Sequence, residues 1–228
     1  MADLQALVAR VKNALASGTP APNHQAPRPP SPEPGGHRAE LVSHFARELE
    51  AIGARIIDPV APEQLAERVG AIVRERGVKS IAVGEGVLVD LSQVAKTLSE
   101  SGIDVIRTGR VDGSTRPEIR KQLAHVDAGL AEADYAIAST GTLAVLSDET
   151  RPSALTLLPP ASLVVVRVDR MQPDLASVLT ALGGASLESH RLTLITGPSR
   201  TADTEKRIVM GVHGPKSLDV IVVWPRDD

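Results

Sequence analysis

Wholly apolar segments alternate with amphipathic segments over most of this chain of 228 residues, and this alternation limits the possible folds more than any other feature. Residues 163–166 are Leu-Val-Val-Val, a composition typical of a strand that is buried on both faces. Residues 41–52 instead place their apolar side chains at helical spacing. Helices that alternate with buried strands cover both faces of a parallel sheet. The sequence therefore predicts a three-layer α/β/α domain around a mainly parallel, mixed sheet.

The predicted elements follow one another in a regular order up to residue 138. Strands are expected at 55–57, 80–83, 103–106 and 134–138, and helices at 41–52, 62–76, 91–101 and 115–126. The order then changes, because the apolar runs 143–146, 154–158 and 163–168 follow one another with no helix between them. We expect these runs to form an antiparallel excursion, which disfavours a pure Rossmann domain. A helix at 173–182 and strands at 192–195 and 218–223 complete the pattern.

The first 37 residues differ from the rest of the chain. Residues 1–18 carry leucines and valines at helical spacing and end at a glycine, which predicts a helical arm. Residues 19–37 are predicted to be a linker, because seven prolines between Thr19 and Gly36 exclude the interior of a helix or strand. The α/β domain is therefore expected to span residues 38–228.

Composition excludes several classes of function. The chain has no cysteine, so it offers no thiol nucleophile, no thiolate zinc site and no cysteine-bound iron–sulfur cluster. A net charge of −3, with one Phe, one Tyr and one Trp, argues against nucleic-acid binding. The histidines have no metal-ligand spacing, so we expect no metal site. Residues 1–18 lack the features of a signal peptide and no segment has the length and apolarity of a membrane span, which favours a cytoplasmic protein.

The strongest local signal is the segment between the predicted strands 192–195 and 218–223. Two loops rich in glycine and proline flank a short expected helix, whose first turn contains Asp203. Backbone N–H groups at a helix N-terminus bind phosphate or carboxylate, and Arg200 could clamp such an anion with two hydrogen bonds. Ordinary helix capping is the alternative interpretation. The candidate ligand-binding residues in this segment are Gly197, Pro198, Ser199, Arg200, Thr201, Asp203 and His213.

Two further loops follow predicted strands. Thr140, Gly141 and Thr142 offer hydroxyl groups beside a flexible glycine, and Glu85 lies between two glycines. In open parallel sheets, ligands bind at the carboxyl ends of strands. We therefore expect both loops to line one crevice together with the loop at 197–200.

Three side chains are candidates for chemistry or charge recognition. His213 could act as a general base or as a hydrogen-bond donor to substrate, or it could simply be solvated. Glu85 is a strand-end carboxylate, although its neighbours in the sequence do not support a role. Arg151 could bind an anion, or it could pair with the acids of segment 147–150. The sequence leaves the catalytic residues unassigned.

Four motifs in a fixed order resemble a known family. They are Glu-Ala-Asp-Tyr-Ala-Ile-Ala-Ser-Thr-Gly-Thr at 132–142, the Arg…Ser…Leu-Leu-Pro stretch at 151–159, Gly-Pro-Ser-Arg-Thr-Ala-Asp…Glu at 197–205, and Gly-Val-His-Gly-Pro at 211–215. They resemble the LUD-domain family, and within it the lactate utilisation protein C group, over about residues 38–224. The family usually has Glu-Thr-Gly-Thr where this chain has Ser139, so a carboxylate at that position is missing here.

The resemblance implies a fold similar to that of the NagB/RpiA/CoA-transferase group. It also implies a role in the oxidation of L-lactate to pyruvate beside partner subunits that carry iron–sulfur clusters, with no cofactor in this chain. Such a chain would bind a small carboxylate such as lactate. Two alternatives stay open: a stand-alone enzyme of isomerase or CoA-transferase type that acts on a small phosphorylated or carboxylated substrate, and a non-catalytic subunit that assists assembly.

Overall fold

The computed structural model describes residues 36–109, 116–148, 150–189, 191–202 and 208–225. The predicted arm and the predicted linker up to residue 35 lie outside these ranges, and helix α2 begins at Gly36. Among the helices of the described ranges, none combines the length and the apolar character that a membrane crossing requires.

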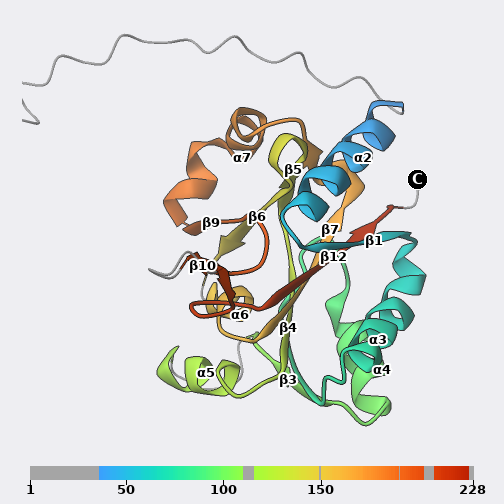
Figure 1. Cartoon of the computed structure of the whole chain (residues 1–228), viewed down its shortest axis with the longest axis vertical. Helices are drawn as coiled ribbons and strands as arrows, with labels where there is room; N and C mark the ends of the chain where they lie inside the picture. Colours follow the sequence, from blue (N-terminus) through green and yellow to red (C-terminus); the bar gives the residue numbers. More distant parts are fainter. Residues whose placement is uncertain (1–35, 110–115, 149, 190, 203–207, 226–228) are drawn as a thin grey trace, which may run out of the picture. The chain divides into compact units, whose positions relative to one another are not determined.

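Helices and strands alternate in the first part of the domain, and strands predominate after it (Figure 1). The helices are α2 (Gly36–Ala51), α3 (Leu65–Glu75), α4 (Leu91–Glu100), α5 (Arg116–Leu123), α6 (Ala154–Leu157) and α7 (Leu175–Ser189), with short 3-10 turns η1 (Pro62–Gln64), η2 (Ala138–Thr140) and η3 (Val168–Arg170). The strands are β1 (Arg55–Val60), β2 (Ser80–Val83), β3 (Asp104–Arg107), β4 (Ala128–Glu132), β5 (Tyr135–Ile137), β6 (Thr142–Ser147), β7 (Ala161–Arg167), β8 (Met171–Gln172), β9 (Arg191–Ile195), β10 (Arg200–Ala202), β11 (Ile208–Met210) and β12 (Ser217–Val223).

Six strands form a central sheet in the order β1-β12-β7-β4-β2-β3, and every pairing in it is parallel. A second sheet has the order β8-β5-β6-β9, with antiparallel pairing at β5–β6 and at β6–β9. Strands β10 and β11 form a separate antiparallel hairpin. The predicted α/β fold with a mainly parallel sheet is confirmed. Of the runs expected in the antiparallel excursion, 143–146 does lie in the antiparallel second sheet as β6, whereas the expectation for 163–168 is wrong, because residues 163–167 belong to β7 of the parallel central sheet.

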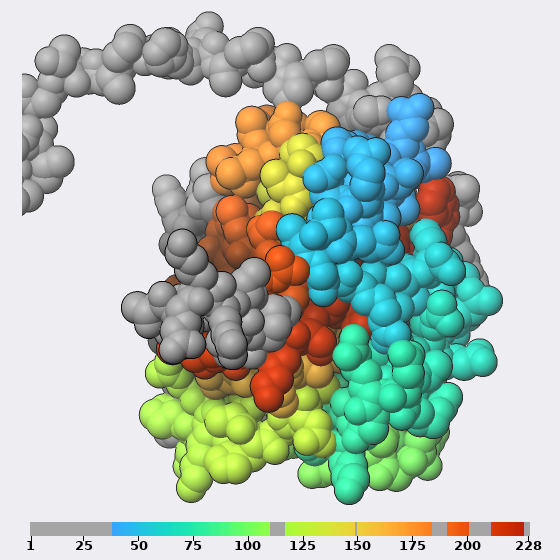
Figure 2. Space-filling model, in the orientation of Figure 1, coloured from blue at the N-terminus to red at the C-terminus, as the bar shows by residue number. Residues whose placement is uncertain are grey.

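Both faces of the central sheet are covered, which explains why its middle strands are wholly apolar. Successive side chains of a strand point to opposite faces, so Val165 and Ile221 pack with α3 and α4, whereas Val164 and Val220 pack with α2 and the second sheet. Helices α5 and α6 cover β2 and β4. In Figure 2 the red C-terminal segment is only partly visible, beside the blue surface that includes α2.

The strand expected at 154–158 is wrong, because residues 154–157 form helix α6. Pro152 precedes this segment and Pro159 follows it, and a residue without an N–H donor does not fit inside a sheet. The helix lies against β4 instead. A side chain on Gly129 would place its Cβ 2.3 Å from the carbonyl oxygen of Leu155. The glycine therefore permits the helix to approach the sheet closely.

The helix expected after Gly197 is also wrong, because the chain forms the hairpin β10–β11 there. The paired residues are Arg200 with Met210, Thr201 with Val209 and Ala202 with Ile208. Ser199 continues the pairing, since its carbonyl oxygen accepts a hydrogen bond from the backbone N–H of Gly211 at 2.9 Å. Three of the six paired residues are β-branched, and such side chains fit a strand better than a helix.

Two other elements depart from the prediction. Strand β4 was not expected, because Ala-Gly-Leu-Ala-Glu contains no β-branched or aromatic residue that would signal a strand. Its position between β7 and β2 nevertheless buries all of it. Helix α7 extends past the expected end at residue 182, although Gly183, with φ +66° and ψ 164°, interrupts it there.

A buried carboxylate joins strands β1 and β12 to the end of helix α3. Asp219, on β12, is fully buried. Its Oδ1 accepts hydrogen bonds from Nε of Arg55 at 2.6 Å and from Nη2 of Arg76 at 2.7 Å. Arg55 also pairs with the exposed Glu75. Because a carboxylate removed from water is costly unless it is paired, the two guanidinium groups are what allow Asp219 to be buried.

We expect Asp219→Asn to lower the free energy of unfolding by about 3 kcal/mol, because both arginines then lose their buried counter-charge. Urea unfolding measures this difference. Glu75→Gln is the matched control, since it removes an exposed partner of Arg55 and should cost less than about 1 kcal/mol. Equal losses in the two variants would contradict a special role for the buried carboxylate.

Candidate functional site

A chain of threonine hydroxyls joins two of the loops named in the sequence analysis. Thr142, which is only 4% exposed, contacts the hydroxyl of Thr140 at 2.8 Å and that of Thr196 at 2.8 Å. Thr140 belongs to the turn between β5 and β6, and Thr196 follows β9. The structure therefore brings the loop at 140–142 beside the loop at 196–200.

Both loops pack against the C-terminal end of helix α2. Gly141 has a φ of +60°, and a Cβ on it would lie 2.5 Å from the backbone nitrogen of Leu49. Gly197 has a φ of +90°, and a Cβ on it would lie 3.1 Å from Cδ1 of Ile52. Nη2 of Arg200 donates a hydrogen bond to the carbonyl oxygen of Ile52. We call these residues (140–142, 196–200 and the end of α2) the threonine–arginine cluster.

The cluster lacks the positively charged helix N-terminus that the sequence predicted for it. The expected anion cradle depended on the N-terminus of a helix after Gly197, and the hairpin β10–β11 stands there instead. The helix end that is present is the C-terminus of α2, where partial negative charge favours a cation. Arg200 supplies that cation through its bond to Ile52. A guanidinium has five N–H donors, so Arg200 retains donors for an anion, but the helix dipole does not assist it.

Pro198 and Ser199 belong to this cluster, and His213 and Thr201 lie beside it. The backbone N–H of Ser199 donates to the carbonyl oxygen of Pro215 at 2.8 Å. A Cβ on Gly214 would lie 3.1 Å from Cβ of Ser199, so the loop that carries the exposed His213 passes close to Ser199. Pro198 is buried. Thr201 lies in β10 opposite Val209, and Asp203 falls outside the described residues.

Arg151 and Glu85 are engaged elsewhere. Nη1 of Arg151 lies 3.0 Å from Oδ1 of Asp134, and its Nε lies 3.8 Å from Oδ2 of Asp148. Arg151 thus pairs with an acid of segment 147–150, as the alternative interpretation held, and with one more distant in the sequence. Glu85 pairs with Arg107 at 3.0 Å, where β2 and β3 end. Neither residue has a hydrogen bond to the threonine–arginine cluster within the described ranges.

Glu132 is a buried carboxylate that fixes the loop between β2 and α4. It is 4% exposed at the end of β4. Its Oε1 accepts a hydrogen bond from the backbone N–H of Leu88 at 2.9 Å, and Oε2 accepts from that of Val87. Burial raises the pKa of Glu132, and the two backbone hydrogen bonds oppose that shift. The sequence places Glu132 in a motif but does not show that its carboxylate binds the backbone of the loop before α4, since that loop lies more than 40 residues away.

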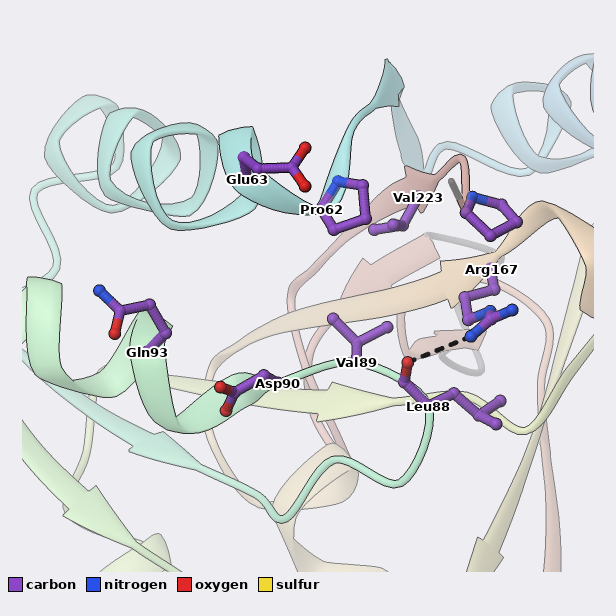
Figure 3. A pocket seen from close by; sticks show the side chains of 9 residues that line it. Pro62, Glu63, Leu88, Val89, Asp90, Gln93, Arg167 and Val223 are labelled. Carbon is purple, nitrogen blue, oxygen red and sulfur yellow. Dashed lines mark hydrogen bonds between the residues drawn. The ribbon is translucent and has the colours of Figure 1, made fainter. Parts of the chain in front are cut away.

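A cavity of about 290 Å³, which we call the carboxyl-edge cavity, lies where β7 and β12 end (Figure 3). Its lining consists of Pro62, Glu63, Leu88, Val89, Asp90, Gln93, Arg167, Val223 and Pro225. Figure 3 shows Arg167 bonded to the carbonyl oxygen of Leu88, at 3.4 Å, so the loop held by Glu132 forms part of the cavity wall. Arg167 and Val223 end strands of the parallel sheet, so the rule that ligands bind at the carboxyl ends of strands indicates this place from the sequence as well.

No three His, Asp or Glu side chains come together as metal ligands in the part of the chain that the structure describes. The polar groups of the two sites are instead hydroxyls, carboxylates and guanidinium groups. These groups suit the binding of hydroxyl and carboxyl groups of a small molecule.

The raised pKa of Glu132 predicts a pH dependence of stability that Glu132→Gln removes. A carboxyl whose pKa is raised by folding stabilises the protein at low pH, and this contribution is lost as the pH rises through the folded-state pKa. The free energy of unfolding of the wild type minus that of the variant should therefore fall as the pH rises above the usual pKa range of a glutamate. Urea unfolding over a pH series measures this difference, and a rise or a constant value would contradict it.

Comparison with known proteins identifies the family. The family model described as LUD domain matches residues 42–223. Lactate utilization protein C from Deinococcus radiodurans is 32% identical over 199 residues, which are 86% of this chain and 85% of that protein. The uncharacterized protein YkgG from Escherichia coli is 25% identical over 190 residues, 82% and 79% of the two chains. The crystal structure of a DUF162 family protein from Deinococcus radiodurans matches the fold with a TM-score of 0.58 at 24% identity, covering 82% of this chain and 98% of that one.

The family match extends over most of the α/β domain. It includes the motifs at 132–142, 151–159, 197–205 and 211–215, so the resemblance inferred from these motifs is confirmed. The chain therefore belongs to the LUD-domain family, in the group that contains the lactate utilization protein C relatives.

Proposed function

We propose that this protein is a component of an L-lactate utilisation system in which lactate is oxidised to pyruvate. The observation that carries the proposal is the alignment with the Deinococcus radiodurans protein named for lactate utilization, which spans 85% of that relative. A second relative named lactate utilization protein C 1, from Bacillus mycoides, aligns over 188 residues, 79% of its length. The correspondence therefore covers most of each relative and is not limited to one shared motif.

The redox step belongs to partner subunits in this proposal. Oxidation of lactate to pyruvate releases two electrons and two protons, so an electron acceptor must be present. The chain has no cysteine in any of its 228 residues and offers no thiolate ligands for an iron–sulfur cluster. We assign electron transfer to partners that carry such clusters, and the binding of substrate or of a related small carboxylate to this chain.

The threonine–arginine cluster is the proposed carboxylate site. Arg200 is exposed and retains N–H donors, and the hydroxyls of Thr140 and Thr196 lie on either side of Thr142. A guanidinium and neutral hydroxyls together favour an anion. Ser139 stands where the family usually has a glutamate, so no negative charge at that position opposes a bound carboxylate. His213, on the neighbouring loop, is the proposed hydrogen-bond partner of the substrate.

The purified chain should show no lactate dehydrogenase activity alone and should gain it when partner subunits that carry iron–sulfur clusters are added. Reduction of an artificial electron acceptor in the presence of L-lactate measures this. Deletion of the gene should also abolish growth on L-lactate while growth on pyruvate continues. Turnover of a phosphorylated or carboxylated substrate by the isolated chain, with growth on lactate intact, would favour the stand-alone isomerase or CoA-transferase alternative instead.

Arg200→Ala should weaken the binding of L-lactate by about 1.5–3 kcal/mol, because a charge-assisted hydrogen bond is lost. Titration calorimetry with lactate, pyruvate and phosphate measures this change. Arg191→Ala removes an exposed cation from β9 and serves as the control. Arg200→Lys keeps the charge and should lose less affinity for L-lactate than the alanine variant does. An affinity that stays the same in Arg200→Ala would exclude the cluster as the carboxylate site.

A further inference from the structure

The carboxyl-edge cavity is separate from the site proposed for a carboxylate, and it has the position at which parallel sheets hold ligands. It lies beyond Arg167 and Val223, the last residues of β7 and β12, and beside the N-terminal ends of η1 and α4 (Figure 3). Its volume of about 290 Å³ is just below the range of about 300–1,000 Å³ that is usual for ligand pockets. The cavity therefore suits a small molecule.

The charges around the cavity oppose an anion. The guanidinium of Arg167 is bound by both carboxylate oxygens of Asp169, at 2.9 and 2.7 Å, so its charge is balanced. Asp90 lines the cavity, and the hydrogen bond from the Ser92 hydroxyl is the main cause that lowers the pKa of Asp90 and keeps it ionised. The charge in the lining that opposes an anion is therefore that of Asp90. A carboxylate or phosphate would meet Coulomb repulsion here.

The same lining offers partners for hydroxyl groups and apolar surface for C–H groups. Asp90 accepts hydrogen bonds from the backbone and the hydroxyl of Ser92 through Oδ1, and a carboxylate has about four acceptor positions, so it can accept from a ligand as well. Gln93, one turn along α4, adds an amide that both donates and accepts. Val89 and Val223 supply apolar surface between these groups and Arg167.

A ligand that uses all of this lining has several hydroxyls on a compact frame with apolar C–H faces. We propose that the carboxyl-edge cavity binds an uncharged, hydroxyl-rich molecule of the size of a monosaccharide or a nucleoside. Its hydroxyls bind Asp90 and Gln93, and its C–H face packs on Val89 and Val223. A phosphate group on the same ligand weakens its binding.

Amide NMR spectra of the full chain, titrated with four ligands, test the proposal. D-Glucose and adenosine distinguish a free sugar from a nucleoside as the source of the hydroxyls, and D-glucose 6-phosphate and adenosine monophosphate are their charged counterparts. We expect saturable shifts at Val89, Asp90 and Gln93 with at least one uncharged ligand, and weaker binding of its phosphorylated form. L-Lactate, added separately, should leave these amides unchanged.

Two variants and a control connect the shifts to the cavity. Asp90→Asn keeps a side chain that caps α4 well but removes the charge. It should lower the affinity for the uncharged ligand about five- to tenfold and reduce the preference for the uncharged ligand over its phosphorylated form. Gln93→Ala should lower the affinity for the same ligand and leave the Asp90 cap of α4 intact. Glu100→Gln neutralises an acid at the far end of the same helix, where Glu100 is 65% exposed and pairs with Lys96, and should change nothing.

Three results would overturn the proposal. They are the absence of saturable shifts with both uncharged ligands, shifts that lie outside the cavity lining, and tighter binding of the phosphorylated forms or of lactate in the cavity. None of these results bears on growth on L-lactate, so the two proposals fail independently.

Discussion

The parallel pairing of β7 with β12 is the constraint on which the rest of the domain depends. The two strands are in register over seven residues, from Ala161 opposite Ser217 to Arg167 opposite Val223. Since both strands are apolar on both faces, they require cover on both sides. Helices α3 and α4 provide it on one face, and α2 with the second sheet provides it on the other. The shared direction of the strands also brings Arg167 and Val223 to one edge, where the carboxyl-edge cavity forms.

The C-terminal end of α2 explains why the family motifs lie where they do. A helix end leaves carbonyl oxygens without partners, and Arg200 satisfies that of Ile52 from a segment 148 residues away in the sequence. Gly141 and Gly197 permit their loops to contact the same turn of helix. Motifs that are distant in the sequence therefore meet at the C-terminal end of α2. A residue there can serve both the fold and a ligand, which is why stability must be measured alongside binding for any variant of Arg200.

Glu132 has the corresponding role at the other site. It lies at the end of β4, where the strand order of the central sheet places it beside the loop after β2. Its carboxylate occupies the backbone donors of Val87 and Leu88, and the carbonyl oxygen of Leu88 in turn accepts from Arg167. One buried acid thus connects β4, the loop before α4 and the end of β7. The shape of the cavity depends on this connection.

The fold class, most of the helices and strands, and the family could be predicted from the sequence, because buried strands and amphipathic helices leave periodic patterns and the motifs are local. The sequence did not determine β4, which has no strand propensity, or α6 and the hairpin β10–β11, whose conformations depend on Gly129 at a close approach and on pairing with a later segment. It also could not show that Arg200 caps α2, that Arg151 pairs with Asp134, or that Arg167 and Asp90 line the same cavity. Those relations join residues far apart in the chain, so only the tertiary structure decides them.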